Sequence, residues 1–188
     1  MVELKAKIIL DKKGEEAYIS IKQLLVKLAW TASVDLDLMA FYEAKDGRTG
    51  GIISDNYPGG NLGSLNEFPY IQLSGDEGVG ATGGDNEEVI RISRLDDLDT
   101  VYICTINYTD AIEKKDSSFA KYDGGVVVID EKGESIAIPL NSPDPGHVAV
   151  IARIENKSAI GAKLINENRI ISLETFAATI PGSYVIVG

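Results

Sequence analysis

The sequence contains few of the residues on which soft-metal and redox centres are built. It has one cysteine, Cys104, and one histidine, His147, in 188 residues. A single cysteine excludes an internal disulfide and any zinc site made of several cysteines. A single histidine excludes every metal motif that needs two. We expect Cys104, which falls within an apolar run, to be a buried and unreactive thiol, and His147 to have no catalytic role.

Basic residues are also scarce. The chain has 18 lysines and arginines against 29 aspartates and glutamates, which gives a formal net charge of −11. Nucleic acids and anionic membranes bind cationic surfaces, so this balance argues against both as partners. No run of about 18 apolar residues is present to span a membrane, and the N-terminal residues lack the apolar stretch of a signal peptide. We therefore expect a cytoplasmic protein that does not insert into membranes.

Apolar residues that alternate with polar ones dominate the rest of the chain and predict strands. The clearest runs, each bounded by turn residues, are 89–92, 101–106, 125–129, 136–140 and 147–154. Only two short helices are expected, one of a turn or two near 110–121 and one over 173–180, before Pro181. Too few helices remain for the crossovers of a parallel α/β fold. The sequence predicts an all-β protein, a single antiparallel β-sandwich domain over residues 1–188 with one or two short helices.

Residues 49–90 differ in composition from the rest of the chain. They include no lysine or arginine, seven acidic residues and ten of the 19 glycines. Loops of such length without regular structure are usually functional or disordered. A strand-like run at 69–73 interrupts this segment and favours an ordered structure.

Two acidic residues occur in a predicted strand over residues 34–41. Alternation places Asp35 and Asp37 on one face of this strand, while Leu36 and Leu38 face the core. Carboxylates about 7 Å apart along a strand repel each other unless water or a cation lies between them.

A second acidic cluster lies in the glycine-rich residues 74–88. Its candidate metal ligands are Asp76, Glu77, Asp85, Asn86, Glu87 and Glu88. Calcium takes six to eight oxygen ligands from carboxylates, carbonyls and amides in flexible geometry, and this segment supplies all three kinds. Magnesium would leave most of these oxygens unused, and metals that prefer thiolate or imidazole are poorly matched. The two clusters together favour calcium, although the spacing is not that of an EF-hand.

Other interpretations of the acidic residues are weaker or remain open. The acidic segment is equally consistent with a solvated surface, or with one that binds a basic protein partner without metal. The glycines of residues 78–83 match a dinucleotide-binding pattern, but no helix follows them and acidic residues flank them. Aromatic residues make up only 7% of the chain, too few for a sugar-binding cleft between paired carboxylates. We expect no enzymatic activity.

Several short motifs occur in the order and approximate spacing of a known family. They lie at residues 13–15, 28–30, 35–41, 75–77 and 85–88. Over roughly residues 3–173 the sequence resembles the TerD family of tellurium-resistance and bacterial stress proteins. One departure is Glu77, which stands where the family has asparagine and adds a charge while keeping a ligand oxygen.

The resemblance implies a β-sandwich that binds one or two calcium ions. By analogy the ligands are Asp35, Asp37, Asp76 and the group at 85–88. Two alignments of the family's last acidic residue remain open. Aligning the strand that follows by its inward and outward positions matches that residue to Glu88, whereas an ungapped alignment from Asp76 matches it to Glu87. The implied function is that of a non-enzymatic stress-response protein that presents its acidic loops to protein partners. The alternative is an acidic interaction or scaffold protein that works without metal.

Overall fold

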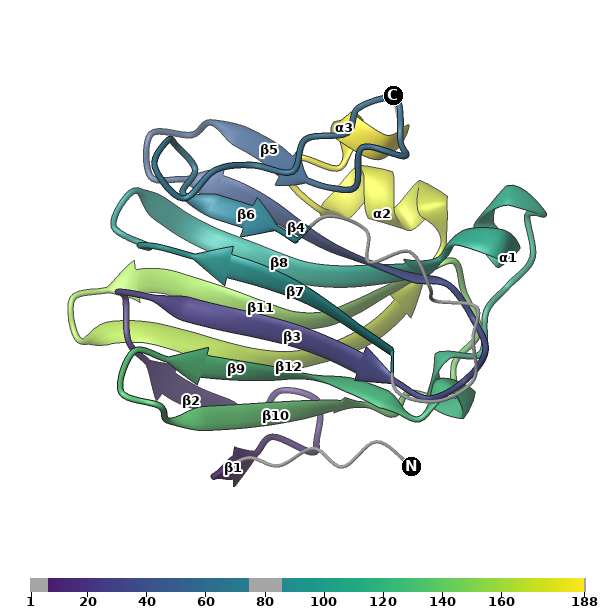
Figure 1. Ribbon diagram of the computed structural model, residues 1–188, viewed down its shortest axis with the longest axis horizontal. Coiled ribbons are helices and arrows are strands. Elements are labelled where there is room, and N and C mark those ends of the chain that lie inside the picture. Colours follow the sequence, from purple (N-terminus) through teal and green to yellow (C-terminus); the bar gives the residue numbers. More distant parts are fainter. Residues whose placement is uncertain (1–6, 75–85, 188) are drawn as a thin grey trace.

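The computed structural model describes residues 7–74 and 86–187, which form two six-stranded sheets packed face to face (Figure 1). In spatial order, sheet A consists of β1 (Ile8–Ile9), β10 (Ser135–Leu140), β9 (Gly124–Asp130), β3 (Leu24–Trp30), β7 (Asn86–Ile92) and β6 (Ile71–Leu73). Sheet B consists of β2 (Glu16–Ile19), β12 (Gly161–Ile171), β11 (Val148–Ser158), β8 (Leu98–Asn107), β4 (Leu36–Ala44) and β5 (Thr49–Ile52). Neighbouring strands pair antiparallel except β1 with β10, and the predicted all-β sandwich is confirmed.

The main core lies between the two sheets and follows directly from the alternation in the sequence. In β3, Leu24, Val26, Leu28 and Trp30 are buried, while the residues between them are partly exposed. Because side chains of a strand alternate between its faces, this pattern puts one apolar face of sheet A against sheet B. Burial of such side chains contributes about 1.5–3 kcal/mol each.

A second, smaller core covers the outer face of sheet B. Helices α2 (Leu173–Thr179) and α3 (Tyr184–Val187) pack on this face. Phe176 of α2 lies edge to face with Phe41 of β4, with ring centroids 5.0 Å apart. Strand β4 is therefore apolar on both faces: Leu36 and Leu38 enter the main core, and Phe41 enters the second core.

The helices agree with the prediction in part. The helix expected over 173–180 is α2, whose first turn is capped by the Ser172 hydroxyl. The helix expected near 110–121 is instead two short pieces, α1 (Tyr108–Ile112) and the 3₁₀ helix η1 (Phe119–Tyr122). The four residues of α3 were not predicted, because so short a helix carries no periodicity. None of the described helices is long and apolar enough to cross a membrane.

Strand register determines which residues meet at one end of the sandwich. Trp30, the last residue of β3, pairs with Asn86, the first residue of β7. On the other sheet, Leu36 at the start of β4 pairs with Asn107 at the end of β8. These four strand ends lie at the end of the sandwich next to α1 (Figure 1), which we call the acidic end because it carries Asp35, Asp37 and Glu88.

Candidate metal-binding site

Asp37 lies near the start of β4 on the face opposite Leu36 and Leu38. Its side chain is 4% exposed, so its carboxylate is largely withdrawn from water. The Tyr57 hydroxyl donates a hydrogen bond to Asp37 Oδ2 at 2.5 Å. Charge-assisted O–H···O⁻ bonds of this length are among the strongest neutral-to-ion contacts in proteins. Asp35 comes just before β4 and is partly exposed.

The charges of both Asp37 and Asp35 affect the pKa of the Tyr57 hydroxyl. Burial, followed by the negative charge of Asp37 and more weakly that of Asp35, raises the pKa of its hydroxyl. The phenol therefore stays protonated at neutral pH and remains a donor. Its ring lies edge to face with Tyr108, with centroids 5.8 Å apart, and the Tyr108 backbone N–H donates to the Asp35 carbonyl at 2.9 Å.

Glu88 and Glu87 lie on opposite faces of β7. Glu88 extends toward sheet B, where its Oε2 accepts a hydrogen bond from the Leu38 backbone N–H at 2.5 Å. Strand β5 pairs with β4 only from Ala40 onward, so Leu38 lies beyond the hydrogen bonds of that strand pair. Glu87 is exposed on the outer face of sheet A and forms an ion pair with Lys27 at 3.6 Å.

The loop between β3 and β4 is tied to the start of β7. The Asn86 amide, 7% exposed, donates through Nδ2 to the Trp30 carbonyl at 3.4 Å and to the Ala32 carbonyl at 3.3 Å. The Trp30 indole N–H donates to the Val34 carbonyl at 2.9 Å. These contacts fix the backbone that leads into the Asp35–Asp37 pair.

The structure brings four of the predicted ligands to the acidic end: Asp35, Asp37, Asn86 and Glu88. It places Glu87 on the other face of its strand. The remaining three, Asp76, Glu77 and Asp85, lie outside the described residues. Within residues 7–74 and 86–187, no group of three or more histidine, cysteine, aspartate or glutamate side chains is arranged as a metal site. The oxygens that are placed are carboxylate and amide oxygens, the donor chemistry that calcium prefers.

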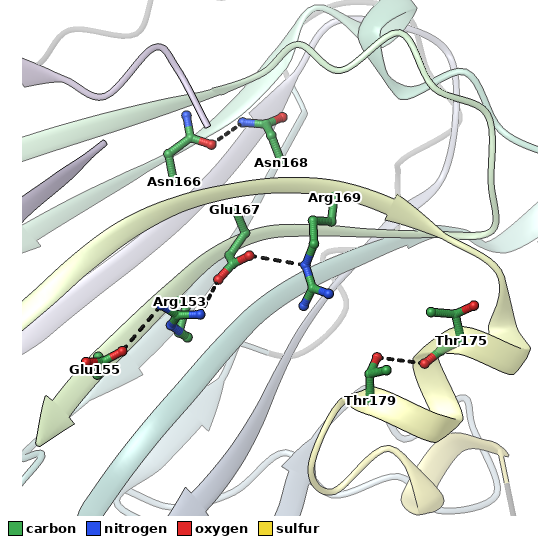
Figure 2. Close-up of polar contacts among 8 residues, drawn as sticks. All are labelled: Arg153, Glu155, Asn166, Glu167, Asn168, Arg169, Thr175 and Thr179. Atoms are coloured by element: carbon green, nitrogen blue, oxygen red, sulfur yellow. Dashed lines mark hydrogen bonds and ion pairs between the residues drawn. The ribbon is translucent and has the colours of Figure 1, made fainter. Parts of the chain in front are cut away.

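Sequence reasoning missed Tyr57, because its contact with Asp37 joins segments 20 residues apart and has no local pattern. It also missed a charged cluster on the outer face of sheet B (Figure 2). There Glu167, 9% exposed, pairs with Arg153 at 2.6 Å and with Arg169 at 3.1 Å, and Arg153 also pairs with Glu155 at 3.3 Å. Figure 2 shows Asn166 and Asn168 on the opposite side of the same strand. The signal was charged residues spaced two apart in two neighbouring strands.

No family model matches the chain, and no curated protein matches it. Its fold is similar to that of solved structures. One is the crystal structure of a homologue of telluride resistance protein (TerD) from Streptomyces coelicolor A3(2), with a TM-score of 0.57, 20% identity, and coverage of 84% of this chain and 96% of that chain. Another is a crystallised protein of unknown function, with a TM-score of 0.56, 14% identity, and coverage of 85% and 96%. The chain therefore has the fold of a TerD homologue, the family that its motifs resemble.

Proposed function

We propose that this protein is a non-enzymatic, calcium-binding stress-response protein of the tellurium-resistance type. One or two calcium ions bind at the acidic end, and the ordered loops there form a surface for protein partners in the cytoplasm. One observation carries the proposal: a nearly buried carboxylate, Asp37, lies in sheet B close to the point where Glu88 reaches across from sheet A.

Electrostatics supports a cation at this place. Asp35 and Asp37 are two residues apart, and, in addition to burial, the negative charge of each raises the pKa of the Tyr57 hydroxyl. Because Asp37 is nearly buried, water screens its charge poorly, and a cation bound beside it would offset the repulsion from neighbouring carboxylates. The adjoining residues 49–90 supply no lysine or arginine that would neutralise them. A divalent ion does so with the oxygen ligands that are present.

Calcium binding would also explain why the sequence combines glycines and acidic residues over residues 74–88. Neighbouring acidic side chains repel each other, and a bound cation that they share holds them in one arrangement. The binding free energy then appears as added stability of the folded state. In this proposal the acidic end presents a defined surface only when it is loaded with calcium.

Thermal unfolding of the wild type and two variants tests the proposal. Asp37→Asn removes one charge but keeps an acceptor for Tyr57. The matched control, Asp46→Asn, changes an exposed aspartate in the β4–β5 turn that pairs with Arg48. At free calcium about 100 times the Kd, we expect the melting temperature of the wild type and of Asp46→Asn to rise by about 5–10 °C. For Asp37→Asn we expect a much smaller rise. Failure of the wild type to respond to millimolar calcium contradicts the proposal.

The second candidate is an acidic scaffold that needs no metal. The net charge of −11 and the acidic residues 49–90, which include no lysine or arginine, favour it. This function predicts binding to a basic partner that weakens with salt and is unchanged by chelators. A pull-down repeated with EDTA and at two salt concentrations separates the two functions.

A further inference from the structure

Tyr57 lies in a braced turn that follows β5. Its backbone N–H donates to the Ser54 carbonyl at 3.2 Å, and its carbonyl accepts from Gly60 N–H at 2.8 Å. The Ser54 hydroxyl also accepts from the Asn56 N–H at 3.2 Å. The ring packs against the second core. Both ends of this side chain are thus held, so the position of its hydroxyl next to Asp37 is determined by the fold.

A second tyrosine, Tyr108, contacts the Tyr57 ring and the backbone at Asp35. Tyr108, the first residue of α1, packs its ring edge to face on Tyr57 and donates its backbone N–H to the Asp35 carbonyl. Helix α1 is itself fixed, because the Asn107 side chain accepts from Asp110 N–H. Tyr57 therefore contacts the Asp37 side chain, and Tyr108 fixes both the Tyr57 ring and the backbone at Asp35.

The geometry points to Tyr57 as a positioning residue that holds the Asp37 carboxylate in one orientation for a bound calcium ion. This inference rests on the calcium site proposed above. A carboxylate has about four acceptor positions, so one hydrogen bond from a phenol leaves others for a cation. Residues that hydrogen-bond to metal ligands orient them, and their loss typically costs 10–100-fold in metal affinity.

Calcium titration of Tyr57→Phe tests this role. The substitution removes one oxygen atom and keeps the ring against Tyr108. The control is Tyr184→Phe, which removes an exposed hydroxyl that donates to the Thr49 carbonyl at 2.7 Å. We expect the calcium Kd to rise at least about tenfold for Tyr57→Phe and to stay at the wild-type value for Tyr184→Phe. Equal affinity in wild type and Tyr57→Phe overturns the inference while leaving the calcium site intact.

A double-mutant cycle separates positioning from a general effect on stability. Asp37→Ala removes both the charge and the acceptor of the Tyr57 hydroxyl, so if Tyr57 acts through Asp37, adding Tyr57→Phe to Asp37→Ala produces little further loss of calcium affinity. A purely structural role instead gives losses that add, and that result overturns the inference. If the wild type itself binds no calcium, both the proposed function and this inference fail. Circular dichroism on each calcium-free variant confirms that the affinities compare folded proteins.

Discussion

The Glu88 carboxylate accepts the backbone N–H of Leu38 at 2.5 Å, and so joins β7 of one sheet to β4 of the other. A buried backbone N–H without a partner costs free energy comparable to a lost hydrogen bond. Glu88 supplies that partner at the point where β5 no longer does. Because Leu38 directly follows Asp37, this contact brings the Glu88 carboxylate to the backbone next to Asp37.

This placement decides which neighbouring glutamate we expect to affect calcium binding. Glu88→Gln should weaken calcium affinity by about tenfold or more, because it removes a charge at the acidic end. Glu87→Gln is the matched control, since Glu87 is exposed on the far face of β7 beside Lys27. Calorimetric titration of both variants checks this. If only Glu87→Gln lost calcium affinity, the result would instead support the ungapped alignment from Asp76, which makes Glu87 the ligand.

The charged cluster on sheet B makes a separate prediction about stability. Glu167→Ala leaves two arginines without their shared carboxylate, whereas Glu155→Ala removes a single partly exposed partner of Arg153. Side chains of Arg153 and Arg169 are 29% and 34% exposed, so water partly compensates them. We expect Glu167→Ala to lower the free energy of unfolding by about 1–3 kcal/mol and Glu155→Ala by less than about 1 kcal/mol. Urea denaturation measures both, and equal losses would mean that Glu167 does not hold the cluster together.

Cys104 should be unreactive in the folded protein. It is fully buried, as expected from the sequence, and burial raises the pKa of its thiol well above the usual value. A free thiol ionises near pH 8.5, and the thiolate is the reactive form. A thiol reagent at pH 7–9 should therefore label the native protein slowly and the urea-unfolded protein quickly. Rapid labelling of the native protein would contradict the burial of β8.

The sequence was informative where structure is local. Alternation in runs such as 101–106 and 125–129 correctly predicted strands, and the break at Pro181 correctly ended α2. The sequence also correctly predicted that Leu38 and Asp37 point to opposite faces of their strand, because successive side chains of a strand alternate between its faces. Together these features were sufficient to predict the sandwich and the strand that carries Asp37, although Asp35, expected in the same strand, lies just before it.

The remaining features depend on contacts between distant segments. The sequence left both Glu87 and Glu88 as candidate ligands, and the pairing of β7 with β3 places their side chains on opposite faces of sheet A. The contact of Tyr57 with Asp37 arises because a turn after β5 folds back over β4. The cluster around Glu167 requires the register of β11 and β12, which shifts at a bulge near Val150. No periodicity encodes such pairings.

Calorimetric titration of calcium into chelator-stripped protein, with magnesium as the control ion, tests the central claim most directly. We predict saturable calcium binding at one or two sites, with magnesium binding much more weakly because magnesium gives up its water reluctantly and would leave most of these oxygens unused. Absence of saturable calcium binding would contradict the account, and would leave the acidic end as a docking surface for a basic protein.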